Sequence, residues 1–525
     1  MLPGLGDQYV WSKDEARPGL VAREMVEGGH WLVPHLGGRV YPNKPPLFPW
    51  LVALASGSRV TEWSLRLPAA VAAAGTVAVT YAIGARAFGA PGGLVSAVLL
   101  ASSVAFFQWG RTGRMDSLVV LWIALAFWSL GRWRAEKRPR DAALFGLWLG
   151  LGLLTKGPIA LVPLAGAVAV GATMVVPLRQ RVLHLGVGLG IAVATLLAWL
   201  GGAAAAAAEF WGYVDAVAAA FAEDVATRPP RAYSYGAATV LTGFLPWSMA
   251  LPVVAVMVAR AGRSGLRTLL LPITWALVVL ALFGLFVSPR EVHFLPVYPA
   301  LALLTGWAWT TASPAARRWL LAAGLAIVAS GAIAALVLAR QRRPLIVHGV
   351  PVAVPPGVGA ALVGLAVVLV VAGVWLARRD RRTTLAILGG GGALIFLLVI
   401  ELAVGTPSAN QALPTREIAA RFAARLPAGA DVTYLDRRFM TALMFYLPTR
   451  GHELSRMDLV RPLLGRPHLH ALVLHAEAVA MANSMCLPVR VRHRETLDHV
   501  AYVLVDFEGP ARVFVFGDDC LPYLE

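Results

Sequence analysis

The chain alternates long apolar segments with short charged ones over most of its length. A transmembrane helix needs about 20 mostly apolar residues, and segments of this kind recur between residues 65 and 404. The candidate spans are 65–84, 92–109, 118–131, 142–155, 158–176, 183–201, 236–259, 267–287, 294–311, 318–339, 357–377 and 384–404. This pattern predicts an all-α polytopic membrane bundle of about 12 transmembrane helices.

The two ends of the chain have a different pattern. Residues 1–64 hold no run of that length, and the apolar run 47–55 is too short to span, so we expect it to be interfacial or re-entrant. Residues 405–525 contain a helical stretch at 415–426 and strand-like runs at 431–435, 471–474, 501–505 and 512–516. We therefore expect three domains: a first loop at 1–64, a bundle at 65–404 and a small α/β domain at 405–525. No glycine-rich phosphate loop follows these strands, so a nucleotide site is not expected.

Composition supports a membrane protein. Of the 525 residues 58% are hydrophobic and only 14% are charged, although the formal net charge is +17. The cations stand in short blocks between apolar runs rather than in a basic stripe with aromatics, which argues against nucleic acid as a partner. These blocks occupy every second loop: Arg86; Arg132, Arg134, Lys137, Arg138 and Arg140; Arg179 and Arg181; Arg260, Arg263 and Arg267; Arg317 and Arg318; Arg378, Arg379, Arg381 and Arg382.

The positive-inside rule assigns these blocks to the cytoplasm. Residues 1–64, the intervening loops and the C-terminal domain then face the outside. Because residue 1 would start on the outer side, we expect one more N-terminal helix upstream of Met1, the alternative being a short N-terminus that is itself translocated. Cys486 and Cys520 would share the outer compartment, where they could pair or remain free thiols.

The first outer loop carries the densest cluster of candidate chemistry. Asp14 and Glu15 are adjacent carboxylates, and neighbouring helix positions do not share a face, so at most one of them points into a given site. Arg17 follows closely, and Lys44 stands before Pro45 and Pro46. An outer carboxylate beside a membrane could orient or deprotonate an acceptor hydroxyl, and Lys44 could meet a phosphate. The alternatives are a solvated acidic pair and a lysine that reaches the lipid headgroups.

The other outer breaks add further cations and one more acid. They contain Arg114 with Asp116, Lys156, Arg228 with Tyr235, and Arg290 with His293. Helix capping by Asp116, interface anchoring by Lys156 and an aromatic belt around Tyr235 are the alternatives. Arg290 is a better candidate than His293, which carries little signal alone. Together, two acids and many cations on one side suit an anionic, phosphate-linked lipid substrate.

Several of these motifs resemble a known family. Asp14-Glu15-Ala16-Arg17, Arg23-Glu24-Met25 and Lys44-Pro45-Pro46 resemble the first outer loop of the lipid A aminoarabinose transferases. These enzymes belong with the protein O-mannosyltransferases in the GT-C superfamily of polyprenyl-phosphate-sugar-dependent glycosyltransferases. Further similar motifs follow in the family's order: Arg114-Met115-Asp116, Leu154-Thr155-Lys156-Gly157, Gly243-Phe244-Leu245-Pro246-Trp247 and 288–304. The resemblance covers nearly all of residues 1–305.

The resemblance implies inverting transfer of a sugar from a polyprenyl phosphate to an acceptor on the outer face of a bacterial inner membrane. Asp14 would then be the central catalytic carboxylate and Asp116 the second acid, with Glu15 a further catalytic candidate. Arg17, Lys44 and Lys156 would hold phosphate groups. Arg114, Arg228, Tyr235 and Arg290 complete the predicted substrate-binding set. The implied partners are a polyprenyl-phosphate sugar, membrane lipids, and a lipid A or other glycolipid, glycan or protein acceptor.

The sequence departs from the family's pattern at two places. The family has Glu before Lys-Pro-Pro, a residue associated with a metal ion, whereas this chain has Asn43. An amide is a poorer ligand than a carboxylate for a divalent ion, so a metal is disfavoured here and no other cofactor is expected. The family's His and Arg-Phe of the middle loop are not evident around 214–221, which weakens the prediction of lipid A and of its sugar.

Two other function classes remain as alternatives to lipopolysaccharide modification or related transfer. A transporter or flippase for lipid-linked saccharides would favour polar residues midway along the helices, and a polymer ligase would favour a large late outer loop. The apolar segments of this chain are nearly free of charge, and the polar candidates gather at one side. This arrangement favours chemistry at the outer membrane surface.

Overall fold

The computed structural model of the protein describes residues 2–41, 44–206, 233–285, 290–316 and 382–427, and beyond these chiefly short strands and one helix. The chain divides into two compact units. The first, here called the helical unit, comprises residues 1–5, 42–48 and 66–405. The second, here called the mixed unit, comprises residues 6–41, 49–65 and 406–525.

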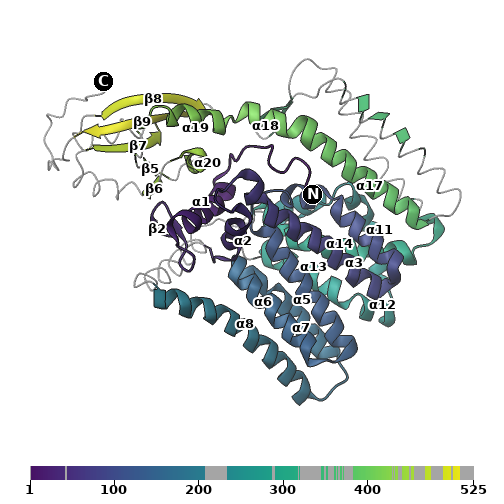
Figure 1. The fold of residues 1–525 in the computed structure, drawn as a ribbon. Coiled ribbons are helices and arrows are strands. Elements are labelled where there is room, and N and C mark those ends of the chain that lie inside the picture. Colours follow the sequence, from purple (N-terminus) through teal and green to yellow (C-terminus); the bar gives the residue numbers. More distant parts are fainter. Residues whose placement is uncertain are drawn as a thin grey trace. The chain divides into compact units, whose positions relative to one another are not determined.

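The helical unit is built from apolar helices (Figure 1). In chain order they are α3 Glu62–Ala101, α4 Val104–Trp109, α5 Asp116–Glu136, α6 Pro139–Lys156, η1 Pro158–Leu161, α7 Val162–Thr173, α8 Leu178–Ala206, α10 Tyr233–Gly243, η2 Trp247–Ala250, α11 Leu251–Ala259, α12 Arg263–Thr268, α13 Leu270–Leu285, η3 Glu291–Val297, α14 Tyr298–Thr311, α17 Arg382–Ile400 and η4 Glu401–Gly405. A short hairpin of β3 Leu345–Val347 and β4 Val350–Val352 also falls in this unit.

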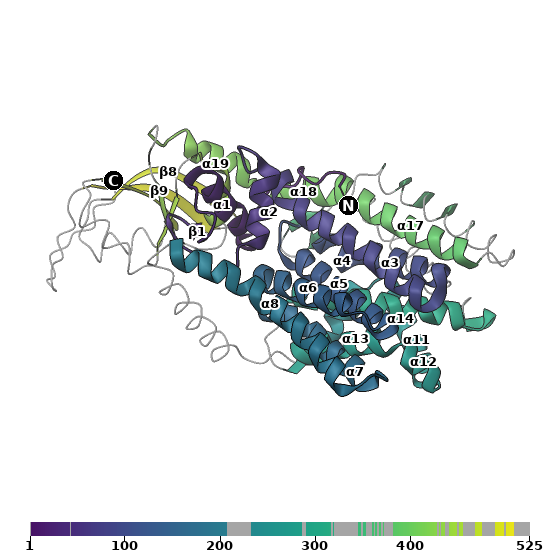
Figure 2. The same cartoon turned by 60° about the horizontal axis from the view of Figure 1, so that its bottom comes forward.

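The core of this unit lies where α5, α6, α7, α8 and α13 pack together (Figure 2). Phe127 of α5 stacks on Trp275 of α13 with ring centroids 4.4 Å apart. Glycines let α6 and α8 approach closely, since a Cβ added to Gly146 would lie 1.8 Å from the carbonyl oxygen of Gly188. Close approach through small residues is a recurring way for helices to associate in lipid.

Among the described residues, four helices are long and apolar enough to cross a membrane, or up to five if a bent pair counts as one span. They are α3, α5, α8 and a helical run at 389–423. Such helices support a multi-pass membrane protein. The candidate spans 318–339 and 357–377 lie largely outside the described residues.

The first two candidate spans correspond to one interrupted element. The backbone of α3 leaves the helical region at Phe88 and Gly89, where Gly89 has φ 82°. A Cβ on Gly93 would lie 2.5 Å from the carbonyl oxygen of Tyr81, so the second leg of α3 packs against the first. The two legs of α3 therefore form a helical hairpin, and the candidate span 92–109 consists of the second leg, which ends at Ala101, and the short α4.

The segment 236–259, expected as one span, is broken. Its halves, Tyr235–Gly243 and Trp247–Ala259, are bent by 108°. Pro246 stands at the break, and proline has no N–H to continue the helical hydrogen bonds. The expected single straight helix is corrected to a broken span or re-entrant pair.

The mixed unit combines polar helices with a sheet. It contains α1 Lys13–Gly28, β1 His35–Leu36, β2 Arg39–Val40, most of α2 Leu47–Ser56, α18 Thr406–Ala412, α19 Thr415–Ala423, β5 Val432–Leu435, α20 Met440–Tyr446, β6 Gly451–Leu454, β7 His468–Leu474, β8 Val489–Leu497 and β9 Val500–Glu508. The five long strands form one mixed sheet in the order β6-β5-β7-β9-β8. Strands β6, β5 and β7 run parallel, whereas β9 is antiparallel to both β7 and β8.

The first loop and the C-terminal region fold together in this unit. Helix α1 packs against α20, and α20 packs against α19. The sequence interpretation placed residues 1–64 and 405–525 in separate domains, yet residues 6–41, 49–65 and 406–525 form one compact body. The strand-like run 512–516, Cys486 and Cys520 lie outside the described residues.

Candidate active site

A buried ion cluster in the helical unit joins three of the predicted site residues. Asp116 starts α5 and Lys156 ends α6, and because the two helices are antiparallel neighbours these ends meet. One carboxylate oxygen of Asp116 pairs with the Lys156 ammonium, and the other accepts a hydrogen bond from Arg114 Nε at 3.3 Å. The Asp116 side chain is only 5% exposed.

Local sequence explains why these side chains meet. Gly157 follows Lys156 with φ 73°, which ends α6 at the lysine. Thr155 accepts a hydrogen bond from Trp122 Nε1 at 3.1 Å, which fixes the end of α6 against α5. Arg114 lies over the ring of Trp109, with its guanidinium carbon 5.4 Å from the ring centroid.

This geometry differs from the simple structural alternatives for Asp116. The N-cap of α5 is Met115, so Asp116 is the first residue of the helix and not its N-cap. Nor is it an exposed surface pair, since the carboxylate is buried with its two cations. A buried carboxylate that fixes two cations is a preorganised site for a group with developing negative charge.

His293 lies beside this cluster, although its sequence signal was weak. Its Nδ1 accepts a hydrogen bond from the backbone N–H of Arg290 at 3.2 Å, and its ring stacks on Phe283. Burial, followed by the nearby Lys156 charge, lowers the pKa of His293 to about 3. The imidazole is therefore neutral near pH 7, and the hydrogen bond to Nδ1 leaves the proton on Nε2.

The remaining predicted residues of the helical unit are more dispersed. Arg290 is exposed at the start of η3, and its charge acts on His293. Tyr235 on α10 and Lys44 before α2 are each half-buried. Arg228 lies outside the described residues, as does Asn43.

The mixed unit holds the other acidic candidates on the first turn of α1. Ser12 is the N-cap, and its hydroxyl accepts a hydrogen bond from the Glu15 N–H at 3.3 Å. Asp14 is half-buried, whereas Glu15 is 4% exposed. Ser12 and Glu15 have the spacing of a capping box, in which the Ser12 side chain accepts from the Glu15 N–H. Arg17, one turn further, is half-buried.

Within the part of the chain that the structure describes, no three or more His, Cys, Asp or Glu side chains gather where they could hold a metal ion.

Part of the chain matches a protein-family model. Residues 43–199 match the model described as dolichyl-phosphate-mannose-protein mannosyltransferase. This range contains Lys44, Arg114, Asp116 and Lys156.

Curated relatives with similar sequences carry one enzyme name. The undecaprenyl phosphate-alpha-4-amino-4-deoxy-L-arabinose arabinosyl transferase of Pseudomonas aeruginosa (strain LESB58) is 30% identical over 365 residues, which is 65% of this chain and 64% of that protein. The enzyme of the same name from Serratia proteamaculans (strain 568) is 26% identical over 319 residues, which is 57% of this chain and 55% of that protein. The chain thus matches somewhat more than half the length of these relatives.

Solved structures show the same fold over nearly the whole chain. The crystal structure of ArnT from Cupriavidus metallidurans bound to undecaprenyl phosphate aligns with a TM-score of 0.75 at 20% identity. The match covers 96% of this chain and 95% of that chain. The apo structure of the same protein gives a TM-score of 0.74. The resemblance expected from the motifs, to GT-C transferases of the aminoarabinose type, is thereby confirmed.

Proposed function

Because the chain resembles aminoarabinose transferases in motifs, sequence and fold, we propose that it is an integral-membrane glycosyltransferase. It moves a sugar from a polyprenyl-phosphate donor to an acceptor. The proposed location is a bacterial inner membrane, with the reacting groups and the C-terminal region on the outer side, as the loop charges predict.

The observation that carries this proposal is the buried cluster of Arg114, Asp116 and Lys156. One carboxylate lies between two cations, so the cluster carries an excess of positive charge. Burial makes that charge act more strongly than it would in water. A phosphate monoanion or dianion is the complementary ligand, because its oxygens accept charge-assisted hydrogen bonds from both cations.

The chemical step needs positive charge beside the leaving group. A nucleophilic oxygen of the acceptor forms a bond to the anomeric carbon as the bond from that carbon to the phosphate oxygen breaks. The electron pair stays on the polyprenyl phosphate, where Lys156 and Arg114 stabilise the growing negative charge. Attack from the face opposite the phosphate inverts the anomeric configuration.

The acceptor side needs a carboxylate when the acceptor is a hydroxyl. We assign this role to Asp14, which orients the hydroxyl and takes its proton as the new glycosidic bond forms. Of the two adjacent acids, Glu15 is almost fully buried at the capping-box position, whereas Asp14 is half-buried. If the acceptor oxygen belongs to a phosphate, no proton is lost and Asp14 only positions groups.

Arg17, Lys44, Arg290 and Tyr235 remain proposed substrate contacts, with Arg228 in the same set. His293 joins them as a neutral Nε2–H donor beside the cluster. A 4-amino-4-deoxy-L-arabinose is the sugar that the relatives' name suggests, and lipid A and other glycolipids, glycans or proteins are the acceptor classes to test.

The test uses the purified full chain in lipid nanodiscs with a panel of undecaprenyl-phosphate sugars and acceptors. We expect transfer with at least one donor and a loss of about 100-fold or more in kcat for Asp14→Asn. Glu136→Gln, a carboxylate-to-amide change at the far end of α5, is the control and should keep wild-type activity. Full activity of Asp14→Asn would overturn its assignment.

A further inference from the structure

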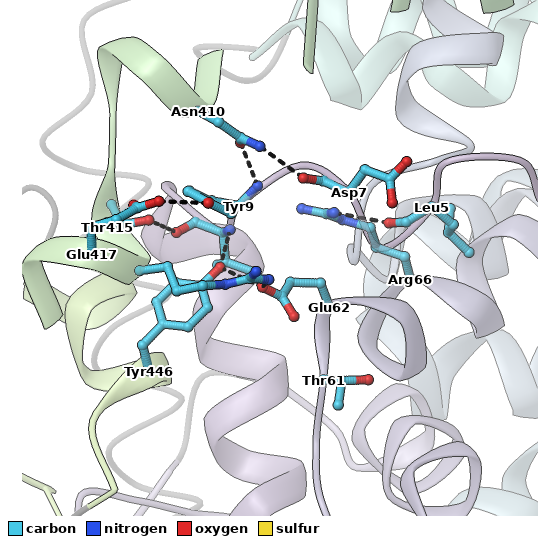
Figure 3. A network of polar contacts seen from close by, with 12 residues as sticks. Leu5, Asp7, Tyr9, Thr61, Glu62, Arg66, Asn410, Thr415, Glu417 and Tyr446 are labelled. Atoms are coloured by element: carbon cyan, nitrogen blue, oxygen red, sulfur yellow. Dashed lines mark hydrogen bonds and ion pairs between the residues drawn. The ribbon is translucent and has the colours of Figure 1, made fainter. Parts of the chain in front are cut away.

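Three residues shortly before α1, namely Asp7, Tyr9 and Val10, are held by side chains from the C-terminal region (Figure 3). The N–H of Tyr9 donates to Asn410 Oδ1 at 2.7 Å, and Asn410 Nδ2 donates to the carbonyl of Asp7 at 2.8 Å. One residue later, the N–H of Val10 donates to the Tyr446 hydroxyl at 2.6 Å. Thr415 Oγ1 donates to the carbonyl of Val10 at 2.8 Å.

A layer of side chains supports these main-chain contacts. The Tyr9 hydroxyl donates to Glu417 at 2.6 Å, and the Tyr446 hydroxyl donates to Glu62 at 2.9 Å (Figure 3). Arg416 pairs with Glu62 and lies over the ring of Tyr9, 4.5 Å from its centroid. Val10 and Thr415 are both fully buried, so the hydrogen bond between them is shielded from water.

Helix α1 itself rests on the same region. Arg23 donates to the carbonyls of Met444 and Leu447, at 3.3 and 3.1 Å, at the C-terminus of α20. Gly19 faces Phe445 so closely that an added Cβ would lie 2.6 Å from the ring. The C-terminal region therefore holds both the entry to α1 and the helix face two turns further on.

The sequence of α1 makes its first turn depend on such support. Pro18 lies inside the helix and has no N–H to donate to the carbonyl of Asp14. The intrahelical hydrogen bond that would tie Asp14 to the second turn is thus missing from the ladder. Fixing the chain at Tyr9 and Val10 compensates at the point where the helix begins.

From these contacts we propose that Asn410, Thr415 and Tyr446 are positioning residues that fix the first turn of α1, and with it Asp14, for sugar transfer. The C-terminal region is then part of the catalytic apparatus and not an appended domain. This inference rests on the proposed function, because it gives Asp14 its role. Misplacing a catalytic group by about 1 Å can lower a rate by about 100-fold, so such anchoring has a kinetic consequence.

The test compares isosteric variants that remove only a hydrogen-bonding group. Tyr446→Phe removes the hydroxyl that Val10 and Glu62 share, and Thr415→Val removes the donor to the Val10 carbonyl. The control is Arg421→Gln, which breaks the pair between α19 and Glu495 of β8 inside the C-terminal region. Each variant is measured for kcat and KM with the undecaprenyl-phosphate sugar used by the wild type, and for amide hydrogen exchange over residues 9–20.

We expect the double variant Tyr446→Phe with Thr415→Val to lose at least about tenfold in kcat, with less than about twofold change in the KM for the donor. Exchange at the first turn of α1 should rise in the double variant and stay unchanged in Arg421→Gln. If the double variant does not fold, Tyr446→Phe alone carries the test with the same signs.

Wild-type kcat in the double variant, unchanged exchange at α1, or an equal kcat loss in Arg421→Gln would each overturn the inference. A wild-type protein without transferase activity would instead overturn the proposed function and the catalytic half of this inference. The exchange measurement would still decide whether the three side chains hold α1.

Discussion

Asp116 shows how one residue can organise a charged site inside an apolar bundle. Burying a lone carboxylate costs several kcal/mol, so the position is tolerable only because Lys156 and Arg114 contact it. The same contacts fix the two cations that we propose for the donor phosphate. The ion pairs that make the buried carboxylate tolerable are therefore the same ones that position the proposed catalytic cations.

A double-mutant cycle tests the structural half of this statement. Asp116→Asn and Lys156→Met each leave a buried charge with one partner fewer, so each single variant should lower the melting temperature clearly. The double variant should lose less than the sum of the two losses, because the charges of Asp116 and Lys156 are both gone and only Arg114 lacks its carboxylate. Additive losses in a detergent melting experiment would contradict the pairing.

His293 adds a titratable group whose pKa differs between the folded and unfolded states. Its folded pKa of about 3 lies below the usual 6.5, so between these values the unfolded chain binds a proton that the folded chain does not. Stability should therefore rise with pH from about 3 to about 6.5 and level off above that.

The variant His293→Gln should flatten this part of the curve. Melting temperatures of wild type and variant, measured from pH 4 to pH 8 in one detergent, give the comparison. An unchanged slope below pH 6.5 in the variant would show that another group carries the pH dependence.

At the residue scale, the sequence pattern pointed to polar residues that interrupt apolar helices. Arg114, Asp116 and Lys156 were named because they stand at such breaks, and the structure brings them together. A single histidine has no spacing pattern, so His293 was ranked below Arg290 although it lies beside the cluster. The Ser12 to Glu15 spacing carries a readable signal for the N-cap role of Ser12.

At the scale of elements, the close packing of α6 on α8 depends on glycines, which have no side chain. A Cβ on Gly188 would lie 2.4 Å from the carbonyl oxygen of Ala142, whereas Gly190, two residues later in α8, has nothing within 4 Å. Gly188 therefore offers a test position for the helix packing, and Gly190 offers a matched control in the same helix.

We expect Gly188→Ala to lower the melting temperature, because the clash with the α6 backbone forces the helices apart. Gly190→Ala should be neutral or slightly stabilising, since alanine is favoured over glycine within a helix by about 1 kcal/mol. Equal behaviour of the two variants in a thermal melt would argue against close packing of α6 on α8.

Element boundaries were harder to predict than apolar content. The segment 236–259 is apolar throughout, and hydropathy alone does not report a 108° bend. Pro246 marked the place, but a proline inside an apolar run is also compatible with a kinked single span. In the sequence, the break in α3 at Phe88 and Gly89 is marked only by a single glycine, which also occurs within unbroken helices.

The joining of the first loop to the C-terminal region could not be predicted from local pattern. The contacts link Tyr9 to Asn410 and Val10 to Tyr446, some 401 and 436 residues apart. They are side-chain-to-backbone hydrogen bonds, which leave no periodicity in the sequence. Composition identified both segments as polar but did not pair them.

At the scale of the whole molecule, the loop charges predict which side each loop faces. Alkaline phosphatase, a reporter of extracytoplasmic location, should be active when fused after Glu525. A fluorescent reporter of cytoplasmic location should give no signal at the same position. A fusion in the Arg132 to Arg140 loop should behave in the opposite way. The reverse pattern would overturn the proposed orientation and the outer location of Asp14.

The proposed mechanism depends on buried cations of the helical unit that stabilise a departing polyprenyl phosphate. The most direct measurement is the release of undecaprenyl phosphate from an undecaprenyl-phosphate sugar, together with sugar incorporation into acceptor, by wild type and by Lys156→Met. We expect equal amounts of both products from wild type and a kcat lower by about 100-fold in Lys156→Met. Wild-type turnover by Lys156→Met in a folded protein, or sugar incorporation without release of undecaprenyl phosphate, would contradict this mechanism.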